Sequence, residues 1–155
     1  MKNSLNQLHF QAIVNSDLDR LMPIENACHS HPWSEKTFSS CIGGRYFSEL
    51  ASLNEQVLGF YVGELVLDEA TLMDICVMPE HQGKGYGKAL LMQFITQATK
   101  AGAQKLFLEV RAKNISAQML YINMGFTETG RRTGYYPSAS GFGYEDAIVM
   151  SKSLS

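Results

Sequence analysis

The sequence contains little that would hold a metal ion or form disulfides. Its three cysteines, Cys28, Cys41 and Cys76, are an odd number, and no two of them have C-x-x-C spacing. Structural zinc sites and disulfide frameworks usually show such paired cysteines, so we expect neither, and we expect a reducing compartment. At 155 residues the chain can bury roughly two-thirds of its unfolded surface, so it needs no cross-link to fold.

Long apolar runs and a strong excess of one charge are also missing. No run approaches the roughly 18 residues of a membrane span, and the polar start, Met1 to Gln7, lacks the apolar core of a signal peptide. The net charge of −2 argues against a strong intrinsic grip on a nucleic-acid backbone, although docking on a protein of a nucleoprotein particle stays open. We therefore expect one cytoplasmic domain, residues 1–155, that binds neither membrane nor nucleic acid directly.

A histidine pair in a turn-like segment is the one feature that suggests a metal ligand. His29 and His31 precede Pro32-Trp33. No third ligand follows at a matching spacing, so we expect both imidazoles to face solvent and we expect no metal site. Trp33 and Phe38 should fill an edge of the core.

The most informative stretch is residues 73–91, in which an apolar strand runs into Pro79, a glycine-rich turn and then an apolar-periodic helix. The turn contains three alternate glycines and two lysines, Gly83, Gly85, Gly87, Lys84 and Lys88. Glycines remove Cβ atoms where a ligand must approach the backbone, and the first N–H groups of a helix have no intrahelical partner. The stretch therefore predicts a site for a phosphate or pyrophosphate.

Other nucleotide-binding motifs fit this turn poorly. From Gly83 to Gly87-Lys88 the spacing is one residue too short for a P-loop, and Ala89 stands where a P-loop has Ser or Thr. The glycines follow G-x-G-x-G rather than the G-x-G-x-x-G of a dinucleotide site. A turn that serves only helix entry stays possible, but it needs one left-handed glycine and not three.

The order of predicted elements indicates the fold class. Alternating apolar residues predict strands at 8–14, 45–53, 56–67, 70–78, 105–110, 126–132 and 144–151. Helical spacing and capping residues predict helices at 16–29, 34–42, 85–101 and 114–125, with Pro23 as a kink or break in the first. We expect an α/β fold in which helices cover both faces of a mixed, mostly antiparallel sheet, with one central parallel strand pair that splays apart.

Two side chains could carry acyl transfer to an amine, which needs a base and a proton donor. Glu109 lies at the end of the strand that follows the glycine helix, where ligands bind in open α/β sheets. A carboxylate is a weak base toward an amine unless it is desolvated or acts through water, so we expect partial burial beside Phe107; an ion pair with Arg111 explains Glu109 equally well. Tyr121 could protonate a thiolate, but it also fits an ordinary core tyrosine on its helix.

The oxyanion that forms in acyl transfer needs a hydrogen-bond donor. A backbone N–H of Ile75-Cys76-Val77 could supply it if the sheet splays beside that strand.

The glycine turn resembles the acetyl-coenzyme A loop of the GNAT N-acetyltransferases, because Gln82-x-x-Gly85-x-Gly87 follows Val77-Met78-Pro79. Within that family, further segments are similar to the bacterial ribosomal-protein-alanine N-acetyltransferases. These segments are His31–Phe38, Leu67–Leu72, Leu108–Asn114, Leu120-Tyr121 with Gly125-Phe126, Tyr135–Pro137 and Glu145–Ala147.

The resemblance implies transfer of acetyl from acetyl-coenzyme A to the N-terminal alanine of a small-subunit ribosomal protein. It implies Glu109 as proton acceptor and Tyr121 as proton donor. It assigns to acetyl-coenzyme A the residues Ile75, Cys76, Val77, Gly83, Lys84, Gly85, Tyr86, Gly87, Lys88 and Asn114, and to the peptide groove Trp33, Tyr135 and Tyr136. Acetylation of protein lysines or of a small amine is the alternative within the enzyme class, and an acyl-coenzyme A-binding module without turnover is the alternative outside it.

The last hairpin departs from the family pattern. Thr133-Gly134 and residues 138–144 make it longer and more aromatic than the family's short turn. We expect a mobile loop over residues 133–143. Loops tolerate insertion, so the peptide selectivity is affected rather than the fold.

Overall fold

A computed structural model of the chain describes residues 7–154, so most of the polar start considered above lies outside it. Its strands are β1 (His9–Ala12), β2 (Tyr46–Leu53), β3 (Gln56–Val66), β4 (Glu69–Val77), β5 (Lys105–Arg111), β6 (Thr127–Pro137) and β7 (Tyr144–Ser153). Its helices are the 3₁₀ turns η1 (Asn15–Asp17) and η2 (Pro79–His81), and α2 (Leu18–Cys28), α3 (Glu35–Ser40), α4 (Tyr86–Lys100) and α5 (Ile115–Asn123). Within these residues no helix has the length and apolarity that a membrane crossing requires.

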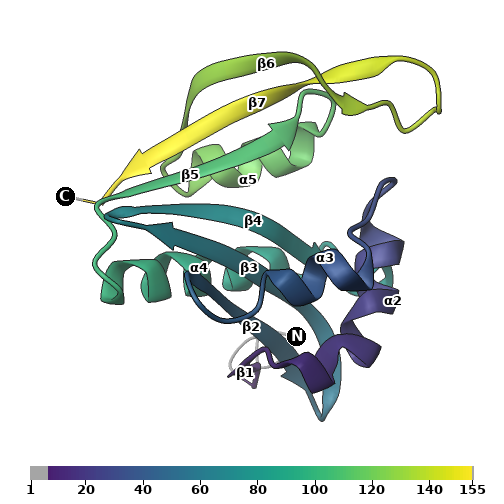
Figure 1. Cartoon of the computed structure of the whole chain (residues 1–155), viewed down its shortest axis with the longest axis vertical. Coiled ribbons are helices and arrows are strands. Elements are labelled where there is room, and N and C mark those ends of the chain that lie inside the picture. The colour runs from purple at the N-terminus through teal and green to yellow at the C-terminus, as the bar shows by residue number, and fades with distance from the viewer. Residues whose placement is uncertain (1–6, 155) are drawn as a thin grey trace.

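The seven strands form one mixed sheet in the order β1-β2-β3-β4-β5-β7-β6 (Figure 1). Every neighbouring pair is antiparallel except β4 and β5, which are parallel. The connection from β4 to β5 contains α4, as parallel neighbours require a crossover. The mixed sheet with one central parallel pair confirms the predicted fold class.

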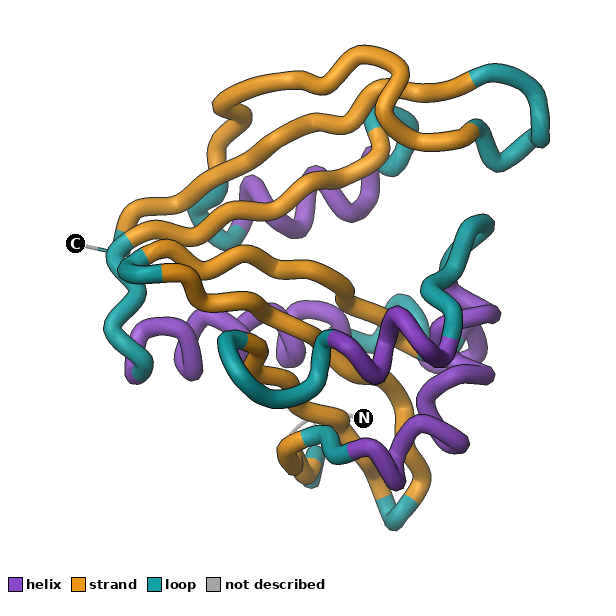
Figure 2. Tube along the Cα trace, viewed as in Figure 1, coloured by secondary structure: helices purple, strands orange, loops and turns teal. Residues whose placement is uncertain are grey.

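The parallel pair is joined along only part of its length. Its pairing runs from Glu69 opposite Lys105 to Leu72 opposite Leu108, whereas the two strands continue to Val77 and Arg111. Figure 2 shows the strand traces of the two halves diverging beyond this point. The predicted splay is therefore present, and it leaves an opening at the carboxyl ends of both strands.

A β-bulge in β4 coincides with the start of the splay. The register between β3 and β4 shifts so that Gly63 faces Leu72 while Val62 faces Asp74, which leaves Met73 as the extra residue. Side chains normally alternate between the faces of a strand, and one extra residue changes which face later residues occupy. As a result Leu72 and Ile75 pack on the same apolar cluster although they are three positions apart.

Helices cover both faces of the sheet, as expected. One apolar cluster joins the sheet to α4 and α5 and includes Leu90, Phe94, Leu106 and Tyr121. The other joins the opposite face to α2 and α3. It consists of Ile13, Leu18, Leu21, Ile24, Phe38, Cys41, Leu50, Phe60, Val62 and Cys76. The middle of β3 is thus buried on both faces, whereas every second residue of β5 stays partly accessible on the side of the opening.

Most predicted element ends agree with the structure. Ser34 and Asn114 accept hydrogen bonds from the backbone N–H groups of Thr37 and Ala117, so both act as N-caps. Asn54-Glu55 forms the hairpin turn between β2 and β3 with φ values of 51° and 70°, as a type I′ turn requires.

The start of the first helix was predicted wrongly. A 3₁₀ turn, η1, precedes α2, so the α-helix begins at Leu18 rather than at residue 16, and the Asp17 carboxylate accepts the Val14 N–H at 2.8 Å. Of the two outcomes expected at Pro23, a kink or a break, the break is excluded, because α2 continues through the proline. Its buried residues Leu21 and Ile24 lie on either side of the proline, and their packing holds the helix together.

The predicted loop at residues 133–143 is too long. Strand β6 extends to Pro137, which pairs with Tyr144, so only residues 138–143 connect the two strands. The Gly134 N–H donates to Asp146 Oδ1 at 2.9 Å and ties the irregular part of β6 to β7. The Gly, Ser and Tyr content suggested a loop, but pairing with β7 prevails over this composition.

Candidate active site

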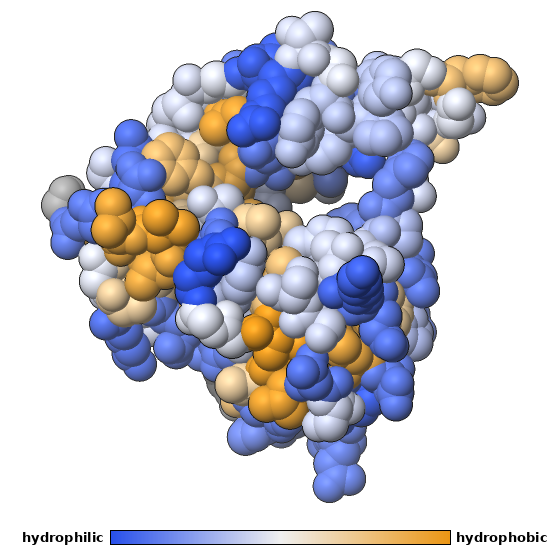
Figure 3. Space-filling model, in the orientation of Figure 1, coloured by the Kyte–Doolittle hydropathy of each residue, from blue (hydrophilic) through white to orange (hydrophobic). Residues whose placement is uncertain are grey.

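A cavity of about 720 Å³ lies at the opening between β4 and β5. Figure 3 shows the molecule hollowed between the projecting β6–β7 end and the body below it. The lining includes ten residues predicted to act in the site: Trp33, Ile75, Cys76, Val77, Gly83, Gly87, Glu109, Asn114, Tyr121 and Tyr136. The structure thus brings together residues from six segments of the chain.

The glycine turn and α4 form one end of this cavity. Gly83 and Gly85 have φ values of 78° and 89°, which side chains other than glycine rarely adopt. The helical hydrogen bonds begin with the Ala89 N–H donating to the Gly85 carbonyl at 3.1 Å, so the N–H groups of residues 86–88 precede them. A Cβ atom added at Gly87 would meet only Val77 and Leu120 at 3.9 and 4.0 Å and would otherwise project into open space.

Four predicted residues of the turn are not among the described residues that line the cavity: Lys84, Gly85, Tyr86 and Lys88. Tyr86 is buried, and its ring meets His81 edge to face at 6.3 Å, so its side chain belongs to the core. Lys84 and Lys88 are exposed. The loop therefore offers backbone groups to the cavity, and its lysines contribute charge from outside the lining.

The free edge of β4 forms the opposite wall. The Met78 N–H donates to the Leu58 carbonyl at 2.8 Å, so alternate residues of β4 turn their backbone groups toward β3. Ile75 and Val77 consequently turn theirs toward the opening. The Val77 carbonyl accepts instead from Gln82 Nε2 at 3.0 Å and from the Cys28 thiol at 3.1 Å. Gln82 thus links the glycine turn to the strand.

Glu109 lies on the β5 side of the cavity. Its side chain is 27% exposed, and its Oε2 lies 3.2 Å from Arg132 Nε. That oxygen is buried, and within the described part of the chain it accepts no well-aligned hydrogen bond, so the arginine contact is electrostatic. The expected alternative, an ion pair with Arg111, is wrong. Arg111 instead donates to Glu145 at 2.9 Å and to the Pro137 carbonyl at 2.8 Å.

Tyr121 is both a core residue and a cavity residue. It belongs to the cluster under α5, where its ring meets Phe126 edge to face at 6.1 Å. It also lines the cavity. Burial raises the pKa of the Tyr121 phenol well above its usual value, so the hydroxyl remains protonated at any physiological pH.

The aromatic residues expected at the peptide groove divide into two groups. Tyr136 lines the cavity, and burial, followed by the charge of Glu109, raises its pKa to about 12. Tyr135 is 48% exposed, and it stacks under Arg132 without joining the described lining. Trp33 lines the cavity and also packs on Phe38 with the ring centroids 5.5 Å apart, which confirms its expected place at a core edge.

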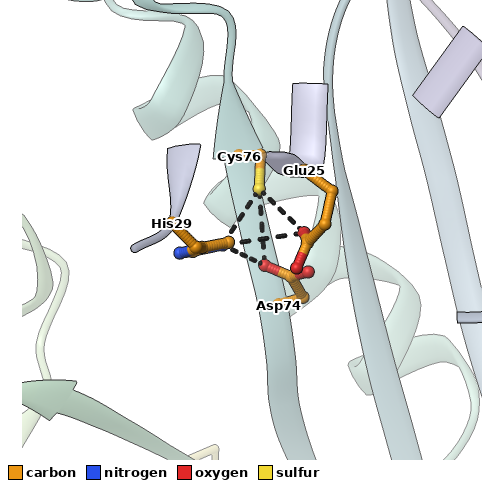
Figure 4. Close-up of side chains that lie close together, drawn as sticks. All are labelled: Glu25, His29, Asp74 and Cys76. Atoms are coloured by element: carbon orange, nitrogen blue, oxygen red, sulfur yellow. Dashed lines mark hydrogen bonds and ion pairs between the residues drawn. The ribbon is translucent and has the colours of Figure 1, made fainter. Parts of the chain in front are cut away.

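The expectation that His29 faces solvent is wrong. His29 Nε2 lies 2.8 Å from Asp74 Oδ1, and Glu25 and Cys76 complete a cluster around it (Figure 4). Burial and the Asp74 carboxylate raise the pKa of Glu25 to about 8, whereas hydrogen bonds from His29 and Glu25 outweigh burial and lower the pKa of Asp74. The sequence contains two spacings that could have indicated this cluster. Glu25 and His29 are four residues apart and share a helix face, and Asp74 and Cys76 are two residues apart and share a strand face.

Comparison with known proteins agrees with this geometry. A family model described as the acetyltransferase (GNAT) family matches residues 18–126. The ribosomal protein bS18-alanine N-acetyltransferase of Escherichia coli K12 is 42% identical over 93% of this chain and 96% of its own, and that of Haemophilus influenzae is 45% identical over 87% and 91%. The crystal structure of the Escherichia coli enzyme superposes with a TM-score of 0.90 at 41% identity, covering 96% of this chain and 94% of its own.

A glycine turn at a helix N-terminus, a splayed parallel strand pair and matches of this length lead to one conclusion. The chain belongs to the acetyltransferase (GNAT) family and is an acetyl-coenzyme A-dependent N-acetyltransferase.

Proposed function

We propose that the chain transfers the acetyl group of acetyl-coenzyme A to the N-terminal alanine of ribosomal protein bS18 in the cytoplasm, without direct contact with nucleic acid or membrane. The observation that carries this proposal is the 42% identity, over 93% of the chain, to a relative named for that reaction. The cavity supports it, because Glu109 and Tyr121 line one space with the glycine turn.

The cofactor end of the site is proposed at the glycine turn. The N–H groups of residues 86–88 precede the hydrogen-bonded part of α4 and suit a pyrophosphate. Asn114 caps α5 and lines the same cavity, so it can contact the cofactor from the other half of the sheet. The residues proposed to hold acetyl-coenzyme A are Ile75, Cys76, Val77, Gly83, Lys84, Gly85, Tyr86, Gly87, Lys88 and Asn114, with Lys84 and Lys88 acting only through charge.

The chemistry is proposed for two side chains and one strand edge. Glu109 accepts a proton from the alanine ammonium, directly or through water, so that the amine nitrogen can attack the thioester carbonyl carbon. A backbone N–H of Ile75 or Val77 stabilises the negative charge on the carbonyl oxygen. As the new C–N bond forms and the C–S bond breaks, Tyr121 donates a proton to the departing thiolate, and the second proton that the nitrogen loses passes through water and restores the phenol.

The peptide end is proposed beside Trp33 and Tyr136. Both line the cavity, and Tyr136 lies under the Arg111 guanidinium at 4.5 Å. Tyr135 lies outside the lining, stacked on Arg132, so it acts through the position of that arginine or meets residues farther along the peptide.

The test compares three acceptors with acetyl-coenzyme A in a steady-state assay. One is a short peptide beginning Ala-Arg, the second is the same peptide blocked at its N-terminus and carrying an internal lysine, and the third is a free polyamine. Reaction of the free N-terminus alone is expected. Equal or faster reaction of the blocked peptide or the polyamine would favour the lysine or small-amine alternative. Cofactor binding without transfer to any acceptor would favour a binding module.

A further inference from the structure

Four side chains that can ligate a metal converge on the wall of the cavity between α2 and β4. Glu25 and His29 lie one helical turn apart on α2, and Asp74 and Cys76 lie on the same face of β4 after the Met73 bulge. One donor atom from each lies within 4.8 Å of all the others. Figure 4 shows the four side chains pointing toward a common centre.

The distances between these donor atoms are close to those in a tetrahedral zinc site. With Zn–N and Zn–O near 2.0–2.2 Å and Zn–S near 2.3 Å, the edges of the tetrahedron are roughly 3.3–3.6 Å. Cys76 Sγ lies 3.4 Å from Glu25 Oε1, 3.4 Å from Asp74 Oδ1 and 3.2 Å from His29 Nε2. His29 Nε2 lies 3.7 Å from Glu25 Oε1 and 2.8 Å from Asp74 Oδ1. Small outward shifts along the shortest edges would admit the ion.

The donor set and one orphaned atom also favour a metal. A thiol, an imidazole and two carboxylates suit a borderline-soft ion such as Zn²⁺ and not Mg²⁺ or Ca²⁺, which prefer oxygen alone. Asp74 is only 7% exposed, and its Oδ2 is buried with no hydrogen-bond partner among the described residues. A buried carboxylate with an unpartnered oxygen is costly, and a cation bound at Asp74 Oδ1 offsets the negative charge of the whole carboxylate.

We propose that Glu25, His29, Asp74 and Cys76 bind one Zn²⁺ ion in a four-coordinate site. Four protein ligands leave no open position for substrate, so the ion has a structural role: it ties α2 to β4. All four ligands line the cavity, which gives the ion its path of entry. Binding releases to solvent the Cys76 thiol proton, the Glu25 carboxyl proton and any proton on His29 Nε2, because the ligands are a thiolate, two carboxylates and a neutral imidazole.

This zinc site depends on contacts that sequence spacing does not show, since 45 residues separate His29 from Asp74. It does not depend on the proposed peptide substrate, because none of its four ligands is proposed to contact the peptide or to transfer a proton, and Cys76, which is also assigned to acetyl-coenzyme A, would bind the ion through its thiol. Loss of the site therefore leaves the acetyl-transfer proposal standing, and the reverse also holds.

The test is a Co²⁺ titration of metal-stripped, fully reduced full-length protein without a histidine tag. We expect one equivalent to produce a thiolate-to-cobalt charge-transfer band and the visible bands of tetrahedral cobalt, both of which Zn²⁺ abolishes. Zn²⁺ should also raise the Tm. The variant Cys76→Ser should lose the charge-transfer band. His29→Gln and Asp74→Asn should weaken Co²⁺ binding by about 100-fold or more, which exceeds the loss expected for a residue that only hydrogen-bonds a ligand.

Matched controls lie on the same chain. Cys41→Ser removes a thiol buried in the apolar cluster that joins the sheet to α2 and α3. Cys28→Ser removes the neighbouring thiol that donates to the Val77 carbonyl, and His31→Gln removes an exposed imidazole. All three should retain the titration. Absence of stoichiometric binding in the parent protein would overturn the proposal. So would a charge-transfer band that survives Cys76→Ser, or Asp74→Asn and His29→Gln variants that stay folded by circular dichroism and bind Co²⁺ as the parent does.

Discussion

At the scale of the residue, Glu109 is held by an arginine that is distant in sequence. Arg132 reaches it from β6, whereas Arg111, two positions away on its own strand, is occupied by Glu145. Residues two apart on a strand share a face, which is why Arg111 looked like the natural partner. The positions of β6 and β7, in the last third of the chain, decide which arginine lies beside Glu109. No local sequence pattern shows how those strands are placed.

The variant Glu109→Gln should lower turnover by about 10²–10⁴-fold, the usual contribution of a general base. The loss should be greatest below about pH 7.5, because an α-amine with a pKa near 7.7–8.0 is then mostly protonated. Steady-state rates between pH 6 and 9, together with acetyl-coenzyme A affinity by calorimetry, measure this, and the affinity should be unchanged. The exposed Glu128→Gln on β6 is the control. A loss that is equal at every pH would remove Glu109 from proton abstraction.

The variant Tyr121→Phe should lower turnover while acetyl-coenzyme A binds as before, since only a hydroxyl is lost. Because burial raises the Tyr121 pKa well above 10, the phenol does not ionise below that pH, and it should impose no alkaline decline in the rate between pH 7 and 10. The exposed Tyr144→Phe serves as the matched control. Parent and Tyr121→Phe rates that coincide across this pH range would leave Tyr121 only its packing role.

At the scale of the element, the glycine turn separates two uses of glycine. Gly83 and Gly85 hold left-handed backbone, so a side chain at either would strain the turn itself. Gly87 stands in the first turn of α4 with ordinary helical backbone and open space before it. Gly83 and Gly85 are therefore required by the backbone conformation of the turn, whereas the missing side chain of Gly87 leaves space that a ligand can occupy.

The variant Gly87→Ala tests this distinction. Alanine is a better helix former, so the free energy of unfolding should stay the same or rise by up to about 1 kcal/mol. Acetyl-coenzyme A should nevertheless bind more weakly by about 1–3 kcal/mol, roughly 5- to 150-fold, because the methyl group crowds the proposed pyrophosphate. Chemical denaturation and calorimetry measure the two quantities. In contrast, Gly130→Ala on β6 should leave affinity unchanged, and a Gly87→Ala variant with parental affinity would place the cofactor elsewhere.

The elements were largely predictable from sequence, and the exceptions have physical causes. Helix caps at Ser34 and Asn114 and the turn at Asn54-Glu55 depend on neighbours a few residues away, so local chemistry fixes them. The extension of β6 to Pro137 depends on a register with β7, and the Met73 bulge depends on a register with β3. Such registers are long-range, and composition alone does not specify them.

At the scale of the whole molecule, two halves of the sheet meet along a short seam. β4 and β5 pair over only four positions, from Glu69 to Leu72 and from Lys105 to Leu108. The apolar cluster under α4 and α5 spans this seam and holds the halves together. Motif spacing predicted the cofactor turn and the splay, whereas the cluster of Glu25, His29, Asp74 and Cys76 required knowledge of how α2 lies on β4.

Because the proposed cofactor contacts come from both halves, acetyl-coenzyme A should stabilise the fold. At 100 times its Kd the gain is about 2.7 kcal/mol in the free energy of unfolding, provided that the unfolded chain does not bind it. Thermal unfolding with increasing acetyl-coenzyme A measures the rise in Tm. The rise should shrink in Gly87→Ala at the same ligand concentration, and an unchanged Tm at saturating ligand would contradict binding across the seam.

Because of the bulge at Met73, β4 contains one residue more than the stretch of β3 with which it pairs. Deleting that one residue would make Leu72 and Asp74 neighbours and turn the bulge into a regular ladder, so Leu72 and Ile75 would still face α4 and Cys76 would still face α2. A residue inserted or deleted between Asp74 and Val77, in contrast, would turn the side chains beyond it to the opposite face of the sheet. Among relatives of this chain, β4 should therefore tolerate loss of the Met73 position and substitutions at Met73, which is 39% exposed, but no single insertion or deletion between Asp74 and Val77.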